Sequence, residues 1–151
     1  MNLIAPLITP DTTLLDVSFT SKKKLFEHAA DLFARLYGLK TSDIFSSLFE
    51  RERLGSTALG HGIAIPHGRI KGLKDACGAF YRLRSPLEFD APDNQPVSLC
   101  FILLVPKDAN ERHLQILGEL AHLFGDEAMR MEMLGAAAPS DLIAMLGSWS
   151  S

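Results

Sequence analysis

The stretch VSLCFILLV, residues 97–105, is apolar at every position except Ser98. It is far shorter than the ~20 apolar residues that a membrane-spanning helix requires. A strand that is apolar at every position, rather than at every second position, is typical of a strand that is buried on both faces of its sheet. The stretch therefore predicts a sheet that helices cover on both sides.

Helical and strand patterns alternate on either side of this stretch. Apolar residues recur at helical spacing after Thr20 and Ser21, either of which can cap a helix, and Gly38 is suited to end it. We expect a second helix from Thr41 or Ser42 to the break at Gly55, and further helices over 110–124, 126–134 and 140–146. The last two open on the capping residues Asp126 and Ser140. Further strands are expected over 63–65 and 77–83. The alternation predicts the α/β fold class.

Length and composition limit the kind of protein. A chain of 151 residues fits one domain, and we expect residues 1–151 to form it. A hydrophobic fraction of 47% and a charged fraction of 22% are ordinary for a globular protein. The formal net charge of −3 argues against binding to a phosphate backbone, so nucleic acid is not an expected partner. The one basic run, residues 22–24, opens a predicted helix and fits a solvated face better than a docking patch.

The cysteines and the N-terminus indicate the compartment. Cys77 and Cys100 lie inside predicted strands without the spacing of metal ligands, which predicts buried free thiols rather than a disulfide. The N-terminus lacks a basic segment followed by the apolar core of a signal peptide. We therefore expect a cytoplasmic protein with no segment inserted in a membrane.

The run LGHGIAIPHG, residues 59–68, brings a histidine to the end of a short apolar strand. Pro66 has a fixed φ and no N–H to give to a sheet, and Gly68 has no side chain. His67 is therefore predicted to lie at a strand end, with room for a large group to approach its imidazole. An isolated Pro-His-Gly would fit a turn histidine after a strand better than a reactive site, so the wider pattern decides between the two.

That wider pattern combines Glu52, the Leu59-Gly60 pair and the run from Ile63 to Gly68. It resembles the phosphorylation-site signature of the fructose–mannitol family of enzyme IIA proteins in the bacterial phosphotransferase system. The resemblance extends through Arg51, the Gly55-Ser56-Thr57 turn, residues 89–97 and His113, and covers roughly residues 10–145. Within that family, the sequence is most similar to the nitrogen-regulatory branch. The resemblance implies a mixed central sheet with helices on both faces, and a phosphoryl group carried on His67.

Histidine and arginine suit this chemistry on physical grounds. With a pKa near 6.5, roughly three quarters of an exposed imidazole is neutral at pH 7, so a lone pair is available without a general base. Phosphoryl transfer spreads charge over three oxygens, which a planar guanidinium can bind in pairs. Arg51 is the candidate for that charge, the alternative being an exposed helix arginine paired with Glu50 or another acid. Further phosphate contacts are predicted for Gly55, Ser56, Thr57 and Gly68.

The other histidines differ in their surroundings. His113 lies on an apolar stripe just after a predicted strand ends, and the resemblance places a second active-site histidine there. Its imidazole would bind the phosphoryl group or orient the ring of His67. His28 and His122 lie on polar helix faces and are predicted to be solvated. His61, between two glycines, either lines the rim of the site or belongs to a plain loop.

These observations lead to a phosphocarrier hypothesis. The chain would accept a phosphoryl group on His67 from a small histidine phosphocarrier protein, in its nitrogen-branch version as the resemblance implies, and would act mainly on regulatory target proteins. The alternative is a IIA subunit that passes phosphate to a separate sugar-specific IIB protein. A third hypothesis, a zinc hydrolase built on His61, His67 and His113, lacks a His-Glu-x-x-His helix. We expect no cofactor and no metal, and the missing Gly-rich nucleotide loop argues against ATP as the donor.

Overall fold

The computed structural model describes residues 2–108 and 110–150. Its sheet has six strands: β1 (Thr13–Val17), β2 (Ala58–Gly60), β3 (Ile63–Ala64), β4 (His67–Ile70), β5 (Cys77–Leu87) and β6 (Val97–Pro106). Their order is β1-β5-β6-β3-β2, and β4 also pairs with β6. The α-helices of the described chain are α1 (Lys22–Tyr37), α2 (Thr41–Leu54), α3 (Glu111–Gly125), α4 (Glu127–Gly135) and α5 (Pro139–Ser148).

Strand β6 holds the sheet together. It pairs antiparallel with β5 along one edge and parallel with β3 and β4 along the other, while β1 runs parallel to β5. Cys100, Ile102 and Leu104 of β6 face one hydrophobic core. Phe101 and Leu103 face a second core on the opposite side of the sheet. The prediction that this continuous apolar run is buried on both faces is therefore confirmed.

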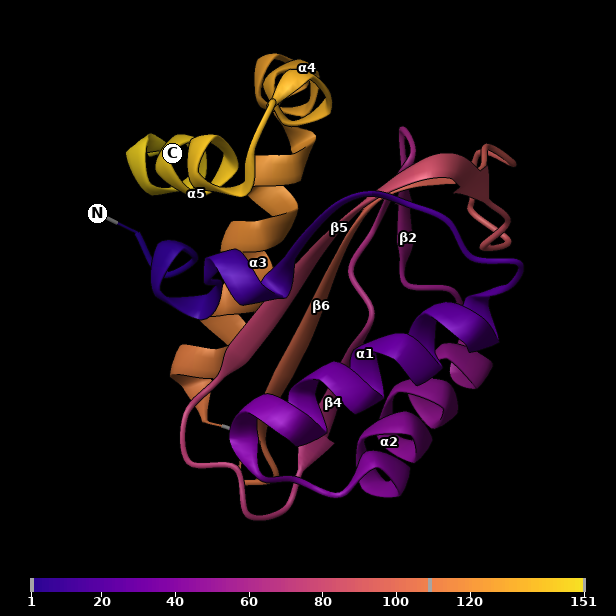
Figure 1. Ribbon diagram of the computed structural model, residues 1–151, viewed down its shortest axis with the longest axis vertical. Helices are drawn as coiled ribbons and strands as arrows, with labels where there is room; N and C mark the ends of the chain where they lie inside the picture. Colours follow the sequence, from indigo (N-terminus) through magenta and orange to yellow (C-terminus); the bar gives the residue numbers. More distant parts are fainter. Residues whose placement is uncertain (1, 109, 151) are drawn as a thin grey trace.

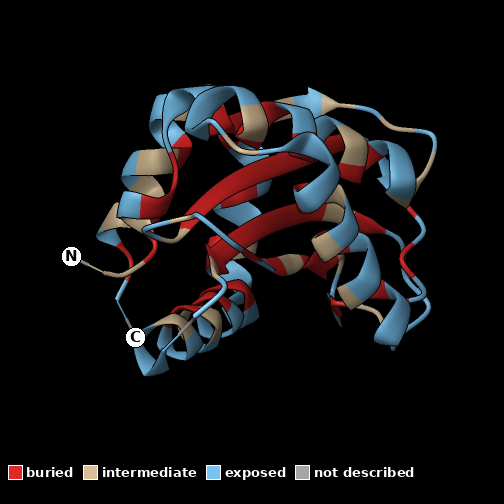
Figure 2. Cartoon of the chain, turned by 90° about the horizontal axis from the view of Figure 1, so that it is seen from below, coloured by how far each residue is buried: buried red, intermediate tan, exposed pale blue. Residues whose placement is uncertain are grey.

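Helices cover both faces of the sheet (Figure 1). α1 and α2 pack against each other over the core that contains Phe33 and Leu48. α3, α4, α5 and the N-terminal 3-10 turn Ala5–Leu7 lie over the core that contains Leu120 and Met133. Figure 2 shows buried strands between helices whose outer surfaces are exposed. The α/β class, with a mixed sheet between two helical layers, is thus confirmed.

Capping residues set most of the helix boundaries. α1 begins after Ser21, whose side chain accepts a backbone hydrogen bond, and ends at Gly38, whose φ of 67° is left-handed. The side chain of Asp126 caps α4 in the same way. The sequence predicts these boundaries correctly. The expected start of the last helix at Ser140 is wrong, because Pro139 takes the first helical position, where a missing N–H costs nothing.

The strands depart further from expectation, since the apolar pattern does not predict β1, β2 or β4. His67 does not end a strand but begins β4. The reason is that the carbonyl of Pro66 accepts a hydrogen bond from the N–H of Leu103 in β6 at 2.9 Å. Proline lacks a backbone donor but keeps its acceptor, so the chain stays alongside β6 beyond Pro66.

Two helical side chains also have partners that their sequence positions do not reveal. Lys22, expected in a solvated basic run, has its Nζ 3.0 Å from Oε2 of the buried Glu52, because the start of α1 lies beside the end of α2. His28 is exposed as predicted, yet its Nδ1 lies 2.8 Å from the hydroxyl of the buried Tyr81. Both contacts tie α1 to the interior.

The cysteines follow the prediction. Cys77 and Cys100 are free and buried. Burial raises the pKa of the Cys77 thiol to about 12, so this thiol stays protonated at neutral pH. In the part of the chain that the structure describes, no helix is both long enough and apolar enough to cross a membrane.

Candidate functional site

A pocket of about 500 Å3 opens where α2, β4 and the start of α3 meet, in the region of β4 at the lower end of the sheet in Figure 1. Its lining includes Ser47, Arg51 and Leu54 of α2, His67, Gly68 and Arg69 of β4, and His113, Leu114 and Leu117 of α3. Three of the predicted site residues, Arg51, His67 and His113, are distant in sequence but share this pocket. Gly68 lines it as well.

The orientation of the His67 ring is fixed by a backbone carbonyl. His67 is half-buried, and its Nδ1 lies 2.9 Å from the oxygen of Ile65. Because a carbonyl oxygen only accepts, Nδ1 carries the proton of the neutral ring and Nε2 keeps the lone pair. Burial lowers the pKa of His67, the bond to Ile65 opposes that shift, and the charge of Arg51 adds to it. The neutral ring, with Nε2 as the unbonded nitrogen, is therefore favoured at pH 7.

His113 has the opposite tautomer. It occupies the third position of α3, and Asn110 is the N-cap. The backbone N–H of Asn110 donates to Nδ1 of His113 at 3.0 Å, so the proton of the neutral ring lies on Nε2. The same capping box that starts the helix thus sets the protonation pattern of the ring. One pocket contains a lone pair on Nε2 of His67 and a donor on Nε2 of His113.

Two arginines line the pocket. Arg51 is half-buried, and its Nη1 donates to the carbonyl of Gly55 at 2.9 Å. The alternative partner, Glu50, pairs instead with Arg53 at 3.0 Å. Arg69 is exposed and follows His67 by two residues along β4, which places both side chains on one face of the strand. The pocket therefore has two guanidinium groups on its wall.

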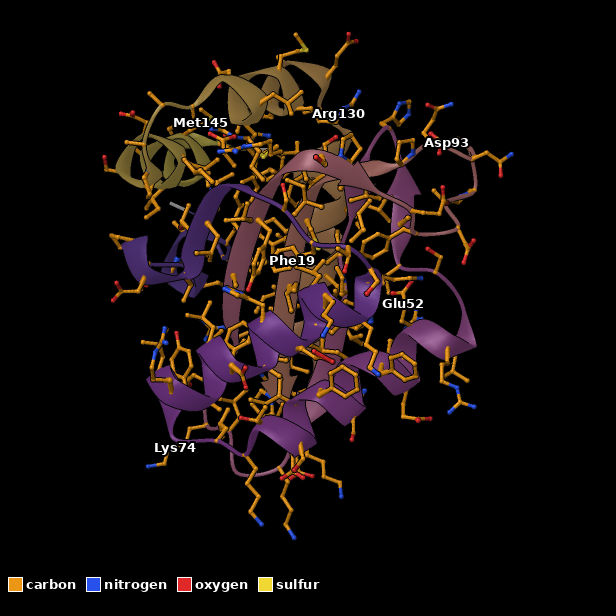
Figure 3. All side chains as sticks on the ribbon, turned by 45° about the vertical axis from the view of Figure 1, so that its right-hand side comes forward. Phe19, Glu52, Lys74, Asp93, Arg130 and Met145 are labelled. Carbon is orange, nitrogen blue, oxygen red and sulfur yellow. The ribbon has the colours of Figure 1, made fainter. Side chains whose placement is uncertain are left out.

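The predicted phosphate contacts at residues 55–57 lie outside the pocket lining. The Ser56 hydroxyl donates to a backbone carbonyl at 2.5 Å. The buried Thr57 donates its hydroxyl to Oε1 of Glu52 at 2.6 Å, and its backbone N–H bonds to the same carboxylate. These hydroxyls, with Glu52 (Figure 3), hold the turn whose Gly55 carbonyl accepts from Arg51. Direct contact of this turn with phosphate stays a prediction.

His61 lies away from this pocket. It stands in the turn between β2 and β3 with a φ of 56°, and its backbone N–H donates to Oδ2 of Asp93 at 2.9 Å. Figure 3 shows Asp93 and Arg130 at the end of the molecule opposite Lys74. Within residues 2–108 and 110–150, no group of three or more His, Cys, Asp or Glu side chains could hold a metal ion. The three histidines of the zinc hypothesis are therefore not gathered at one place.

Sequence reasoning omits two parts of the pocket. One is an apolar rim of Leu54, Leu114 and Leu117, of which Leu54 is 86% and Leu114 63% exposed. Large apolar side chains left in solvent around a pocket that contains charged groups are typical of a docking surface. The exposure of Leu114 could have been predicted, because this residue lies off the apolar stripe of its helix that faces the interior. The other is Arg69, which matches the family's motif position less firmly than Arg51. Its spacing of two from His67, which places both side chains on one face of a strand, is the available signal.

Comparisons with known proteins identify similar chains. Residues 6–148 match the family described as phosphoenolpyruvate-dependent sugar phosphotransferase system, EIIA 2. The chain is 41% identical over 131 residues to the Nitrogen regulatory protein of Pseudomonas aeruginosa, covering 86% of this chain and 85% of that protein. The crystal structure of nitrogen regulatory protein IIA-Ntr from Neisseria meningitidis has a TM-score of 0.91 and 46% identity, covering 96% of this chain and 99% of that chain. The mannitol IIA of Escherichia coli, at 19% identity, shares the fold with a TM-score of 0.77 over 92% of this chain and 98% of that chain.

Proposed function

Because the chain belongs to the EIIA 2 family of the phosphoenolpyruvate-dependent sugar phosphotransferase system, we propose that it is a phosphocarrier that accepts a phosphoryl group on Nε2 of His67. The observation that carries the proposal is the hydrogen bond from Nδ1 of His67 to Ile65. It leaves Nε2 as the free nucleophile in a pocket that also contains Arg51 and His113. In this proposal, residues 1–151 form a single EIIA domain.

The transfer step follows from the tautomer of His67. The lone pair on Nε2 attacks the phosphorus of a phosphohistidine on the donor protein. A new N–P bond forms on His67 while the donor's N–P bond breaks, and the donor ring leaves with that electron pair. Nδ1–H of His67 stays bonded to the carbonyl oxygen of Ile65, and this oxygen stabilises the positive charge that develops on the ring. In this proposal the step needs no general base, because the attacking nitrogen is already unprotonated.

Two neighbouring groups supply charge compensation. During transfer, negative charge is spread over the three equatorial oxygens of the phosphoryl group. Arg51 has guanidinium N–H groups beyond the one bonded to Gly55, and His113 donates from Nε2. Donors that are held in place before the reaction stabilise such charge without reorganisation. Arg51 and His113 therefore assist transfer in this proposal, and neither carries the phosphate.

The apolar rim supports a protein as the donor. A histidine phosphocarrier protein can present its phosphohistidine into the pocket while it covers Leu54 and Leu114, which are highly exposed in the free chain. Protein interfaces of ordinary size bury about 800 Å2 on each side, so a protein donor would cover the rim as well as the pocket. The donor that we propose is the small histidine phosphocarrier of the phosphotransferase system, in its nitrogen-branch version.

A mainly regulatory role is the second part of the proposal. It is supported by the similarity to proteins named nitrogen regulatory protein in Pseudomonas aeruginosa and Neisseria meningitidis. A phosphoryl group adds up to about two negative charges beside the apolar rim of a chain whose formal net charge is −3. A target that covers the rim would then be repelled from the phosphorylated form, and donor and target would compete for one surface.

The phosphocarrier role is tested by incubation of the chain with phosphoenolpyruvate and the general phosphotransferase components, followed by peptide mapping of the label. We expect one stable label on His67, in a phosphoramidate linkage that survives alkali and breaks in acid. A stable label on another residue, or no label at all, would contradict the proposal.

The regulatory role needs a separate test. Parent chain, phosphorylated chain and His67→Ala are used as baits in a cytoplasmic extract. We expect a partner, other than phosphotransferase components, that binds the parent chain and His67→Ala but leaves the phosphorylated chain. If every retained protein is a phosphotransferase component, a IIA subunit that feeds a sugar-specific IIB protein is the better description.

A further inference from the structure

The open edge of β4 is covered by one side chain of α2. The carbonyl of Pro66 accepts a hydrogen bond from Leu103 of β6 at 2.9 Å, and the carbonyl of Ile70 accepts one from Lys107, the residue after β6, at 3.1 Å. Because successive residues of a strand direct their peptide groups to opposite sides, the N–H and C=O of Arg69 face away from β6. Both are bonded to Ser47: the N–H of Arg69 donates to Oγ at 2.9 Å, and Oγ donates to the carbonyl at 3.0 Å. One hydroxyl thus takes the place of a neighbouring strand.

Gly68 makes this contact possible. A Cβ at position 68 would overlap Oγ of Ser47 and would lie 3.0 Å from its Cβ. Both contacts would be closer than packed carbon and oxygen atoms allow. The glycine after His67 therefore has a second use besides leaving room for a ligand, because it allows α2 to approach β4 as closely as the two hydrogen bonds require.

The same contact sets the distance between two groups of the site. Ser47 and Arg51 are four residues apart on α2, so they share one helix face and both line the pocket. On β4, the bonded residue Arg69 and the close neighbour Gly68 directly follow His67. We propose that Ser47 is a positioning residue, which docks α2 on β4 so that the guanidinium of Arg51 reaches the phosphoryl group on His67. This proposal rests on the phosphocarrier function.

Neighbouring Ser46 provides a matched control. It stands in the same turn of α2 but is exposed, whereas Ser47 is half-buried against β4. Alanine is the best helix former, so neither Ser46→Ala nor Ser47→Ala weakens the helix itself. Thermal unfolding of both variants confirms that they are folded at the assay temperature.

The first measurement is single-turnover transfer from the phosphorylated donor protein. A small misplacement of a group in such a site commonly costs up to about 10²-fold in rate, so we expect Ser47→Ala to be slower by roughly tenfold to 10²-fold, and Ser46→Ala to stay within about twofold. In an Arg51→Gln background, Ser47→Ala should change the rate by less than about twofold, because its effect passes through Arg51. Equal slowing in both backgrounds, or a parental rate for Ser47→Ala, would overturn the proposal.

The second measurement is independent of phosphorylation. The charge of Arg51 lowers the pKa of His67, so a displaced guanidinium should let that pKa rise. NMR titration of the His67 ring should show this rise in Ser47→Ala, no rise in Ser46→Ala, and no further rise when Ser47→Ala is added to Arg51→Gln. An unchanged His67 pKa in Ser47→Ala would overturn the positioning role. Failure of the parent chain to be labelled would instead overturn the phosphocarrier function, and the titration would still test the geometry.

Discussion

Two histidines that neighbour glycine in the run LGHGIAIPHG have opposite surroundings. His61 is exposed in a turn, and the contact that holds this residue is made by its backbone to Asp93. His67 is half-buried, and its ring is bonded to Ile65 in a pocket with Arg51 and His113. The two residues are close in sequence, but β3 separates them along the sheet.

The difference shows what makes a histidine a candidate for chemistry. Glycine neighbours provide access at both positions, so access alone does not distinguish them. What distinguishes His67 is its position along β6. Both β3 and β4 lie parallel to β6, but β4 pairs with Leu103–Pro106, and this register brings it beside α2 and the start of α3. A nucleophile needs a fixed ring and nearby donors, and both come from elements that are distant in sequence.

The largest expected effect is the loss of labelling in His67→Ala. In the phosphocarrier proposal this variant keeps its fold, because the ring makes one side-chain bond, to Ile65, but it has no nucleophile. His61→Ala, the matched variant at the other end of β3, should be labelled at the parental rate. Labelling from phosphoenolpyruvate with purified components measures both. Full labelling of His67→Ala, or loss of labelling in His61→Ala, would contradict the assignment of His67, rather than His61, as the phosphorylated residue.

The next effect concerns two donors that share the pocket of His67, Arg51 and His113. Removing one preorganised donor commonly costs on the order of 10²–10³ in rate, about 2.7–4 kcal/mol. Arg51→Lys and His113→Ala should each slow transfer by amounts of this order, the first because lysine does not present a planar fork of donors.

Controls for these two variants come from the same helices. Arg53→Lys removes an exposed guanidinium from α2, and His122→Ala removes an exposed ring from α3. Stopped-flow transfer rates should be parental for both controls. If Arg51→Lys and His113→Ala also stay within a factor of two of the parent, neither group touches the phosphoryl oxygens.

A smaller effect is expected from Thr57→Val. Its hydroxyl and Glu52 form a buried hydrogen bond of 2.6 Å, and a buried carboxylate left without that partner costs about 1–3 kcal/mol. We expect the free energy of unfolding to fall by this amount in urea titrations, with a transfer rate within about threefold of the parent. The opposite result, a large loss of rate at unchanged stability, would make Thr57 a phosphate ligand.

The smallest effect is a dependence on pH. Burial lowers the pKa of His67 from its ordinary value of 6.5, so the ring stays neutral to a lower pH than a free imidazole, and transfer should decline only below pH 6.5. Between the two pKa values the unfolded chain binds more protons than the folded chain, so stability falls as the pH drops through that window. His67→Ala should remove this part of the decline in urea titrations from pH 7 to 5. A decline in transfer that begins above pH 6.5 would contradict the lowered pKa.

The helices could be predicted from the sequence because their signals are local. Ser21, Gly38 and Asp126 act on the neighbouring backbone alone, and each is where the structure has a boundary. The apolar run of β6 was equally clear, since its length excludes a membrane span and its continuity requires two cores. His67, His113 and Arg51 could be named from the resemblance to a family signature, but their arrangement around one pocket could not be predicted from it.

The remaining strands and contacts depend on residues that are distant in sequence. β4 begins with His-Gly, which has little strand propensity, and it is extended because β6 offers it partners. The hydroxyls of Ser56 and Thr57 look available to phosphate in the sequence, whereas in the fold they are bonded. Ser47 has no signal of its own, because its role depends on the missing side chain at Gly68.

The pairing of β6 also matters for a chain that leaves the ribosome N-terminus first. β1 pairs with β5, and β3 and β4 pair with β6, so each must await a strand that is synthesised later. Within residues 13–70 of the described chain, the one strand pair is the short β2–β3 hairpin. α1 and α2 therefore emerge with uncovered apolar faces, and such non-local pairing is slow and exposed to aggregation. A nascent chain arrested before Val97 should be cleaved readily by protease. Extension beyond Pro106 should allow the core under α1 and α2 to close, and the second core should close only after α3, α4 and α5 have followed.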